Sequence, residues 1–312
     1  MNMKFGTLLV CWLLLMISSC KKDSGNNDNE QLDASTQQFN DDSNRYKSES
    51  DQADADINEQ LRGMNGFGTA APAASLPCGV SIDVSQLSQK IVTFTFDGVT
   101  RCFIPQRIRA GKIKVQLTSG NLWQDVDAVL TITYDSFKVT RVSDNRSIMF
   151  NGVKTLRNIN GNDWVAFLSS NFTLKYQERA KDMQVTFDNN LHATWNSARI
   201  TEWTYTNNGI PQFNFTCNGD TTINGVSYVD SYGTNRFNHD FVTYYISPLH
   251  SNTHCGLWMP TSGQLVHWIG RNFILFLGVD QNGNPVLSGC AYGFKVTWTA
   301  NNGSQSAVFP YY

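Results

Sequence analysis

The residues best placed to do chemistry lie in the stretch TWNSARITEWTY, residues 194–205. On a β-strand, Trp195, Arg199 and Trp203 point to the same side of the sheet. Such an aromatic–arginine–aromatic row can stack sugar rings or another apolar-faced ligand, while the guanidinium hydrogen-bonds hydroxyls or a carboxylate. The alternative, which we favour, is a cation–π ladder that only stabilises the sheet. If the protein has a ligand, we predict that Trp195, Arg199 and Trp203 bind it.

A second group of reactive side chains is His250, His254 and Cys255. On a helix, two histidines four residues apart share a face and can hold a metal ion. Here Pro248 and Pro260 frame the stretch, which predicts a loop, and we expect Cys255 to form a disulfide. We therefore predict no metal and no cofactor.

Paired carboxylates are the remaining catalytic candidates. Asp125 and Asp127 share one strand face, and Asp97 and Asp135 end other predicted strands. A glycosidase needs two carboxylates at a set separation, which a sequence does not give. Aspartates beside turns are normally turn-formers. The sequence also has no nucleophile elbow and no phosphate-binding glycine loop, so we predict that the protein is not an enzyme.

The first twenty residues indicate where the protein goes. Lys4 precedes the apolar run 8–17, which is typical of a secretory signal and too short for a transmembrane helix. Ile17-Ser18-Ser19-Cys20 resembles a bacterial lipobox, which predicts a signal peptide over 1–19 and lipidation of Cys20. Lys21 stands where an aspartate would favour retention in the inner membrane, so we expect an outer-membrane lipoprotein. An ordinary secretory signal is the alternative.

Charge is distributed unevenly along the chain. Residues 21–76 carry eleven acidic and five basic side chains, whereas residues 77–312 carry fifteen acidic and eighteen basic ones. This small basic excess lacks the dense stripe of a nucleic-acid-binding protein. We therefore expect a membrane partner through the lipid anchor, with a glycan or another envelope component as a candidate ligand, and no nucleic acid.

Five cysteines remain once Cys11 leaves with the signal peptide and Cys20 takes lipid. An exported protein occupies an oxidising compartment, where disulfides persist. Sequence alone does not fix connectivity, but Cys78–Cys102 and Cys255–Cys290 would each bracket one hairpin-sized unit. We predict these two bridges and leave Cys217 as a buried free thiol.

The segment before residue 77 divides into three parts. Residues 20–30 are polar and predict a lipidated tether. Within residues 31–62, apolar side chains recur every seven residues from Leu32 through Phe39 and Tyr46 to Ala53, which predicts a polar amphipathic helix. Residues 63–76 are rich in glycine and alanine and predict a linker.

From residue 77 to 312 the apolar period changes to two, as in Val92, Phe94 and Phe96. This alternation is typical of antiparallel strands with one buried face. Asn-Gly, the preferred pair for tight hairpin turns, occurs seven times, at 151, 160, 208, 218, 224, 282 and 302. The sequence therefore predicts an all-β domain, either a large sandwich or an open, curved sheet. A similar cysteine-bracketed unit begins each half, so two lobes are an open possibility.

Several motifs carry a resemblance to a known group of proteins. They are CGVSIDV, IVTFTFDG, RAGKIKVQLTSG, VLTITYDSFKV, GVKTLRNI and TWNSARITEW. Together they resemble an uncharacterised group of Bacteroidetes-type lipoproteins with a lipobox, a polar helical lead and a cysteine-bracketed β domain. The resemblance covers most of residues 31–300 and implies an envelope location and β architecture, but no activity. The two histidines in 247–260 depart from the group's pattern.

The sequence thus predicts a lipid-anchored envelope protein with a non-catalytic binding or structural role, glycan binding being one form of it. A carrier of lipid or another hydrophobic ligand, held in a curved sheet, is the alternative. A glycan-active enzyme comes third. A continuous apolar concave face would favour the carrier, whereas an exposed Trp–Arg–Trp row would favour glycan binding.

Overall fold

The computed structural model describes residues 27–69, 76–102, 106–162, 172–207, 211–256, 259–300 and 303–311. One long helix precedes a domain of antiparallel strands, so the predicted all-β class with a single leading helix is confirmed. The predicted signal peptide, Cys20 and residues 21–26 of the tether lie outside the described residues, as do residues 70–75 of the predicted linker. None of the helices in the described ranges is long and apolar enough to cross a membrane.

The helix α1 (Asn27–Gly63) begins four residues before the predicted start. Residues 27–30 are therefore helical and do not belong to the tether. Asn27 followed three residues later by Glu30 is a typical helix-start sequence. The polar composition of residues 20–30 led to the prediction of a tether instead. The helix ends at Gly63, as predicted, and the chain then turns through Gly66 in the left-handed region (φ 58°).

The strands form one sheet, in the order β1 to β7, then β10 to β15, with β8 paired to β7 and β11 and β9 paired to β10. Neighbouring strands are antiparallel throughout. Their bounds are β1 (Val80–Asp83), β2 (Ile91–Asp97), β3 (Arg107–Ser119), β4 (Ala128–Arg141), β5 (Ser147–Asn158), β6 (Leu174–Phe187), β7 (Leu191–Asn207), β8 (Pro211–Gly219), β9 (Thr221–Ile223), β10 (Val226–Thr234), β11 (Asp240–Asn252), β12 (Ser262–Trp268), β13 (Asn272–Val279), β14 (Gly293–Ala300) and β15 (Gly303–Pro310).

A row of β-bulges bends this sheet. The register shifts near Gly111 between β3 and β4, and near Ser136 between β4 and β5. It shifts again near Gly152 between β5 and β6, and near Asp182 between β6 and β7. Each of these four residues has a positive φ. Bulges increase twist and bend a strand, so shifts on four neighbouring strands curve the sheet into a trough.

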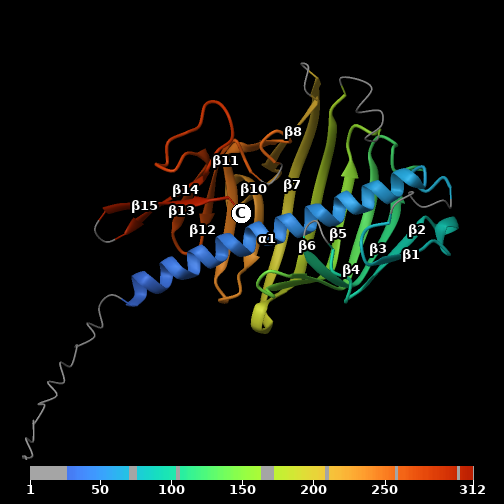
Figure 1. The fold of residues 1–312 in the computed structure, drawn as a ribbon, viewed down its shortest axis with the longest axis horizontal. Coiled ribbons are helices and arrows are strands. Elements are labelled where there is room, and N and C mark those ends of the chain that lie inside the picture. The colour runs from blue at the N-terminus through green and yellow to red at the C-terminus, as the bar shows by residue number, and fades with distance from the viewer. Residues whose placement is uncertain are drawn as a thin grey trace, which may run out of the picture.

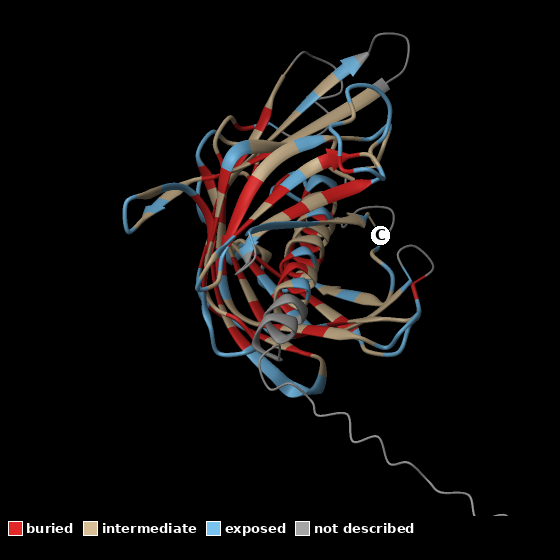
Figure 2. Ribbon diagram, turned by 90° about the vertical axis from the view of Figure 1, so that its left-hand side faces the viewer, coloured by how far each residue is buried: buried red, intermediate tan, exposed pale blue. Residues whose placement is uncertain are grey.

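The trough holds α1. Figures 1 and 2 show the helix running along the inside of the curved sheet. The seven-residue stripe predicted from the sequence faces the sheet, and Phe39, Tyr46, Ala53, Ile57 and Leu61 are all buried in the main hydrophobic core. Burying each of the larger side chains contributes about 1.5–3 kcal/mol. The helix therefore completes the core of the domain.

Both predicted disulfides are present. Cys78 bonds Cys102, and Cys255 bonds Cys290, while Cys217 is a buried free thiol. A second, smaller hydrophobic cluster includes Cys217 and side chains of β11 to β14. The two hydrophobic clusters belong to one continuous sheet.

Among the Asn-Gly pairs that the structure describes, two are not turns, contrary to the prediction. Asn151-Gly152 lies in β5, where the Asn151 side chain accepts a hydrogen bond from the backbone N–H of Ser136 at 2.7 Å. Asn218-Gly219 ends β8, where a Cβ on Gly219 would lie 1.9 Å from the Tyr228 carbonyl oxygen. Asn151-Gly152 is thus part of a β-bulge, and Gly219 allows the backbones of β8 and β10 to approach closely.

Candidate functional site

The predicted binding row on β7 lies largely beneath α1. Trp195 is 0% exposed, and its ring stacks on Phe39 and Tyr46 of the helix, with ring centroids 5.8 and 4.8 Å away. Trp203 is half-buried and packs against Phe215 of β8. The sequence correctly placed these side chains on one strand face, but did not reveal that a helix covers part of it.

Arg199, the middle of the row, forms ion pairs in place of the predicted cation–π ladder. Its guanidinium contacts Asp51 of α1 and, at 2.9 Å, Glu178 of β6. Within the described part of the chain, Arg199 makes no cation–π contact. With Trp195 and Arg199 covered, a glycan has no access to the complete row while α1 is in place.

The histidine stretch is not the loop that was predicted, because β11 continues to Asn252. His250 lies on this strand and contacts the Thr216 hydroxyl through Nδ1 at 3.1 Å. His254 is exposed in the turn that follows. The two prolines flank the region without preventing strand pairing, since Pro248 coincides with a register irregularity between β11 and β12.

The candidate catalytic aspartates form turns and surface contacts. Asp97 accepts hydrogen bonds from the backbone of Val99 and Thr100, both at 2.9 Å. Asp125 accepts two backbone hydrogen bonds, which lower the pKa of its carboxyl group. Asp127 forms an exposed ion pair with Arg157. Asp135 contacts the neighbouring Ser136 hydroxyl. Asp97 and Asp125 thus act as the turn-formers that their positions favoured. Asp125 and Asp127 lie in the turn before β4 and not on a strand face, and Asp135 lies within β4 and does not end a strand, contrary to the prediction.

The sequence did not predict the ion pairs that join α1 to the sheet. Seven charged side chains of the helix meet a partner of opposite charge on another part of the chain. Within the described residues these pairs are Asp42–Arg236 (2.5 Å), Arg45–Asp188 (3.0 Å), Lys47–Asp230 (2.8 Å), Glu49–Arg107 (2.5 Å), Asp51–Arg199, Asp54–Lys154 (2.7 Å) and Asp56–Arg109.

At the centre of this interface Lys154, Glu178 and Arg199 are buried, and Asp54 is partly buried. Burial alone would lower the pKa of Lys154, but the charges of Asp54 and Glu178 outweigh it and raise that pKa above the ordinary lysine value. Burial would likewise raise the pKa of Glu178, but Arg199 and Lys154 hold it well below the ordinary value. For Asp54, burial outweighs the attraction of Lys154 and raises the pKa to about 6.

Three of these carboxylates, Asp51, Asp54 and Glu178, are close enough to share a metal ion, with ligand atoms within 4.8 Å of one another. However, the ammonium group of Lys154 and the guanidinium of Arg199 already contact them. Cationic side chains thus occupy the positions that a metal would need. The cluster is an ion-pair network that fixes the helix in register.

Beside this network, a cavity of about 780 Å³ lies between the middle of α1 and the C-terminal strands. Its apolar wall is formed by strands β8 and β11 to β14 and by the residue after β15. The main apolar contributors are Phe215, Leu249, Leu265, Leu275, Leu277, Phe294 and Tyr311. Several of these belong to the smaller hydrophobic cluster, whose inner face α1 does not fill.

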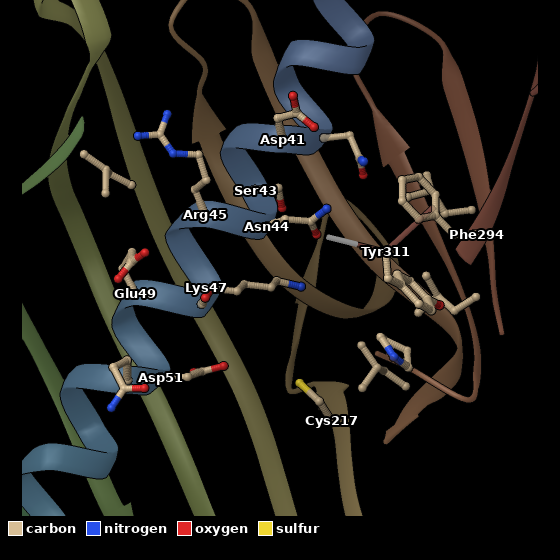
Figure 3. A pocket seen from close by; sticks show the side chains of 18 of the residues that line it. Asp41, Ser43, Asn44, Arg45, Lys47, Glu49, Asp51, Cys217, Phe294 and Tyr311 are labelled. Carbon is tan, nitrogen blue, oxygen red and sulfur yellow. The ribbon is translucent and has the colours of Figure 1, made fainter. Parts of the chain in front are cut away.

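The opposite wall is mostly polar. It includes α1 residues between Asn40 and Gln52 and arginines from β3, β4 and the β4–β5 turn, with the apolar Val139 and Ile148 among them. Figure 3 shows Lys47 extending from the helix toward the C-terminal strands, with Phe294 and Tyr311 across the cavity from α1. The cavity therefore has one apolar side and one charged side.

A short chain of polar side chains lies on the cavity wall between these two sides. Lys47 pairs with Asp230 of β10 at 2.8 Å and donates to the Tyr245 hydroxyl at 3.3 Å. Tyr245 in turn donates to the Cys217 sulfur at 3.6 Å. Burial raises the pKa of the Cys217 thiol to about 11. Cys217 thus remains protonated at neutral pH and lacks the thiolate that a nucleophile needs.

Comparison with protein-family models, curated proteins and solved structures finds no match to this chain. The site therefore has to be interpreted from its own residues. The sequence did contain one signal for the ion pairs. Asp42, Glu49 and Asp56 recur every seven residues, parallel to the apolar stripe through Phe39 and Tyr46.

Proposed function

We propose that this protein is a non-catalytic envelope protein that binds a hydrophobic ligand in the cavity between α1 and the C-terminal strands. The observation that carries the proposal is the apolar wall of that cavity. Leucine and aromatic side chains line a space of about 780 Å³, within the size range of small-molecule sites. This favours the hydrophobic-ligand carrier over glycan binding, whose row on β7 is partly buried under α1.

A lack of catalytic groups around the cavity supports a binding role. Among the described lining residues, Cys217 is held as a thiol and His267 is buried with its pKa lowered to about 3 by burial and by the charge of Lys47. The Cys217 sulfur contacts Tyr245 and the His267 ring contacts Thr243, so the described contacts do not pair these two residues as a nucleophile and its general base. The described carboxylates of the wall are engaged by arginines or lie on the surface of α1.

The experiment is a cavity-filling substitution with a matched control on the same strand. Leu277 lines the cavity, whereas Phe276 lies on the other face of β13 and is 36% exposed. We expect Leu277→Trp to weaken binding of the neutral fluorophore N-phenyl-1-naphthylamine at least about tenfold, while Phe276→Trp leaves binding unchanged. Cooperative unfolding of both variants would verify that they fold. Equal binding by both variants, or none by the wild type, would refute the proposal.

The proposed location follows from the lipobox-like residues at 17–20. Lipidation of Cys20 would hold the protein in the outer membrane, since two or three acyl chains give stable attachment. We expect Cys20→Ser to move the protein from the membrane fraction to the soluble envelope fraction, with Cys11→Ser as the control. If the Cys20→Ser protein still sediments with outer membrane, the anchor is elsewhere.

A further inference from the structure

The polar end of the cavity carries two cationic side chains, the buried Arg199 and the partly exposed Lys47. The Nη2 atom of Arg199 contacts Asp51 and Glu178. Its Nε–H has no partner among the described residues, but the Nε atom has almost no accessible surface, so a ligand in the cavity does not reach it. The donor that a ligand can reach therefore comes from Lys47.

Lys47 reaches the same region from α1. An ammonium group carries three N–H donors, and Asp230 and the Tyr245 hydroxyl account for two of them. The described residues supply no acceptor for the third. Because Asp230 already balances the charge of Lys47, the free donor can serve a neutral carbonyl oxygen as well as a carboxylate.

The apolar wall begins beside Lys47. Lys47 contacts Tyr245, which contacts Cys217, and Leu265, Leu275 and Phe294 continue along the C-terminal strands. A ligand with an oxygen acceptor at one end and a hydrocarbon chain behind it matches both parts of the cavity. An ordinary sugar, with hydroxyl groups all round, would leave polar groups against the leucines.

We propose that the cavity takes an acyl chain, with its carbonyl oxygen accepting a hydrogen bond from Lys47 and its hydrocarbon part lying against β12 to β14. This inference rests on the proposed function. It adds the chemical class of the ligand and its orientation in the cavity. Both a free fatty acid and a fatty-acid ester have this oxygen, so the structure assigns their shared acyl group.

The test compares three probes of equal chain length on the full chain: dodecanoate, methyl dodecanoate and dodecane. Affinity is measured by displacement of N-phenyl-1-naphthylamine. We expect at least one carbonyl-containing probe to bind about tenfold more tightly than dodecane. Preference for dodecanoate would indicate a free acid, and preference for the methyl ester would indicate an ester. Equal affinity for all three would refute the carbonyl assignment while leaving the hydrophobic site intact.

A second measurement locates the carbonyl. Lys47→Met alone would leave buried Asp230 without its cation, so the variant is the double substitution Lys47→Met with Asp230→Asn. The carbonyl carbon of a ¹³C-labelled bound probe should shift between wild type and this variant. The matched control is Lys175→Met with Glu202→Gln, an ion pair between β6 and β7, which should leave the signal unchanged. An identical signal in all three proteins would refute the contact with Lys47. Failure of the fluorophore itself to bind wild type would instead refute the proposed function.

Discussion

Arg236 and Asp42 form a two-point ion pair across 194 residues of sequence, with Nε 2.6 Å from one carboxylate oxygen and Nη2 2.5 Å from the other. Both side chains are nearly inaccessible to solvent, and the guanidinium also lies over the Phe187 ring, 4.3 Å from its centroid. The planar guanidinium matches a carboxylate in this geometry, which fixes the rotation and the position of α1.

Removing one member of this pair should be strongly destabilising. Asp42→Asn leaves the buried guanidinium without its main counter-charge, at a cost of about 3–5 kcal/mol in the free energy of unfolding. The control is Glu59→Gln, which removes an exposed pair with Arg62 and should cost at most about 1 kcal/mol. Denaturant titrations measure both. Similar losses in the two variants would mean that the buried pair contributes no more than a surface one.

Stability should fall in mild acid because of His267. The ring is fully buried, contacts the Thr243 hydroxyl at 2.7 Å and packs edge-on against Phe39 of α1. Its folded pKa is about 3, against 6.5 for the ordinary side chain. The stabilising contribution of the neutral ring is fully present above pH 6.5 and is lost as the pH falls toward 3. At pH 5 the loss is about 2 kcal/mol.

The measurement for His267 is the free energy of unfolding at pH 7.5 and pH 5, in wild type and His267→Phe. Other titrating groups, including Asp42 with its pKa raised to about 6 by burial, contribute to both proteins and cancel in the comparison. Wild type should lose about 2 kcal/mol more than the variant. The same pH dependence in both proteins would show that His267 is not responsible.

The tryptophans of the predicted binding row can be examined by fluorescence quenching. Trp195 should be inaccessible to acrylamide, since the Phe39 and Tyr46 rings of α1 stack on it. Trp268, at the end of β12, is 40% exposed and should be quenched readily. Trp195→Phe should therefore remove an unquenched component, and Trp268→Phe a quenched one. A quenchable Trp195 would mean that α1 does not cover β7 in solution.

The two disulfides should each stabilise the fold. Cys78–Cys102 and Cys255–Cys290 are separated by 24 and 35 residues, so loss of either bond should lower the free energy of unfolding by about 3–4 kcal/mol. Cys78→Ala with Cys102→Ala, and the equivalent pair at 255 and 290, test this by denaturant titration. Non-reduced peptide mapping should find Cys217 unpaired. A disulfide containing Cys217 would contradict the arrangement.

Periodicity accounts for what the sequence predicted well. The seven-residue stripe through Phe39 and Tyr46 identified the helix and its buried face, and two-residue alternation identified the strands. Both patterns arise within one element, where local geometry decides which side chains share a face. Partners on different elements follow no such rule. Arg199 was therefore assigned to Trp195 and Trp203 on its own strand, although its partners lie on α1 and β6.

The sequence does not predict the cavity, for a related reason. It exists because a row of bulges curves the sheet and because α1 fills only part of the resulting trough. Gly111 and Gly152 were visible as glycines, but only the paired strands reveal that their bulges are aligned. The leucines of β13 look like ordinary core residues, and nothing in their own strand indicates that the space above them is open.

The position of α1 has a consequence for the order in which the molecule is made. The helix is synthesised before every strand that it packs against, and Lys47 meets Tyr245 only after 198 further residues. Contacts between such distant residues form slowly. Until β10 and β11 have emerged, the stripe of the helix has no complete trough to enter, and its many charged residues keep the segment hydrated. A nascent chain that stops before Arg236 would hold a helix whose Asp42 still lacks its ionic partner.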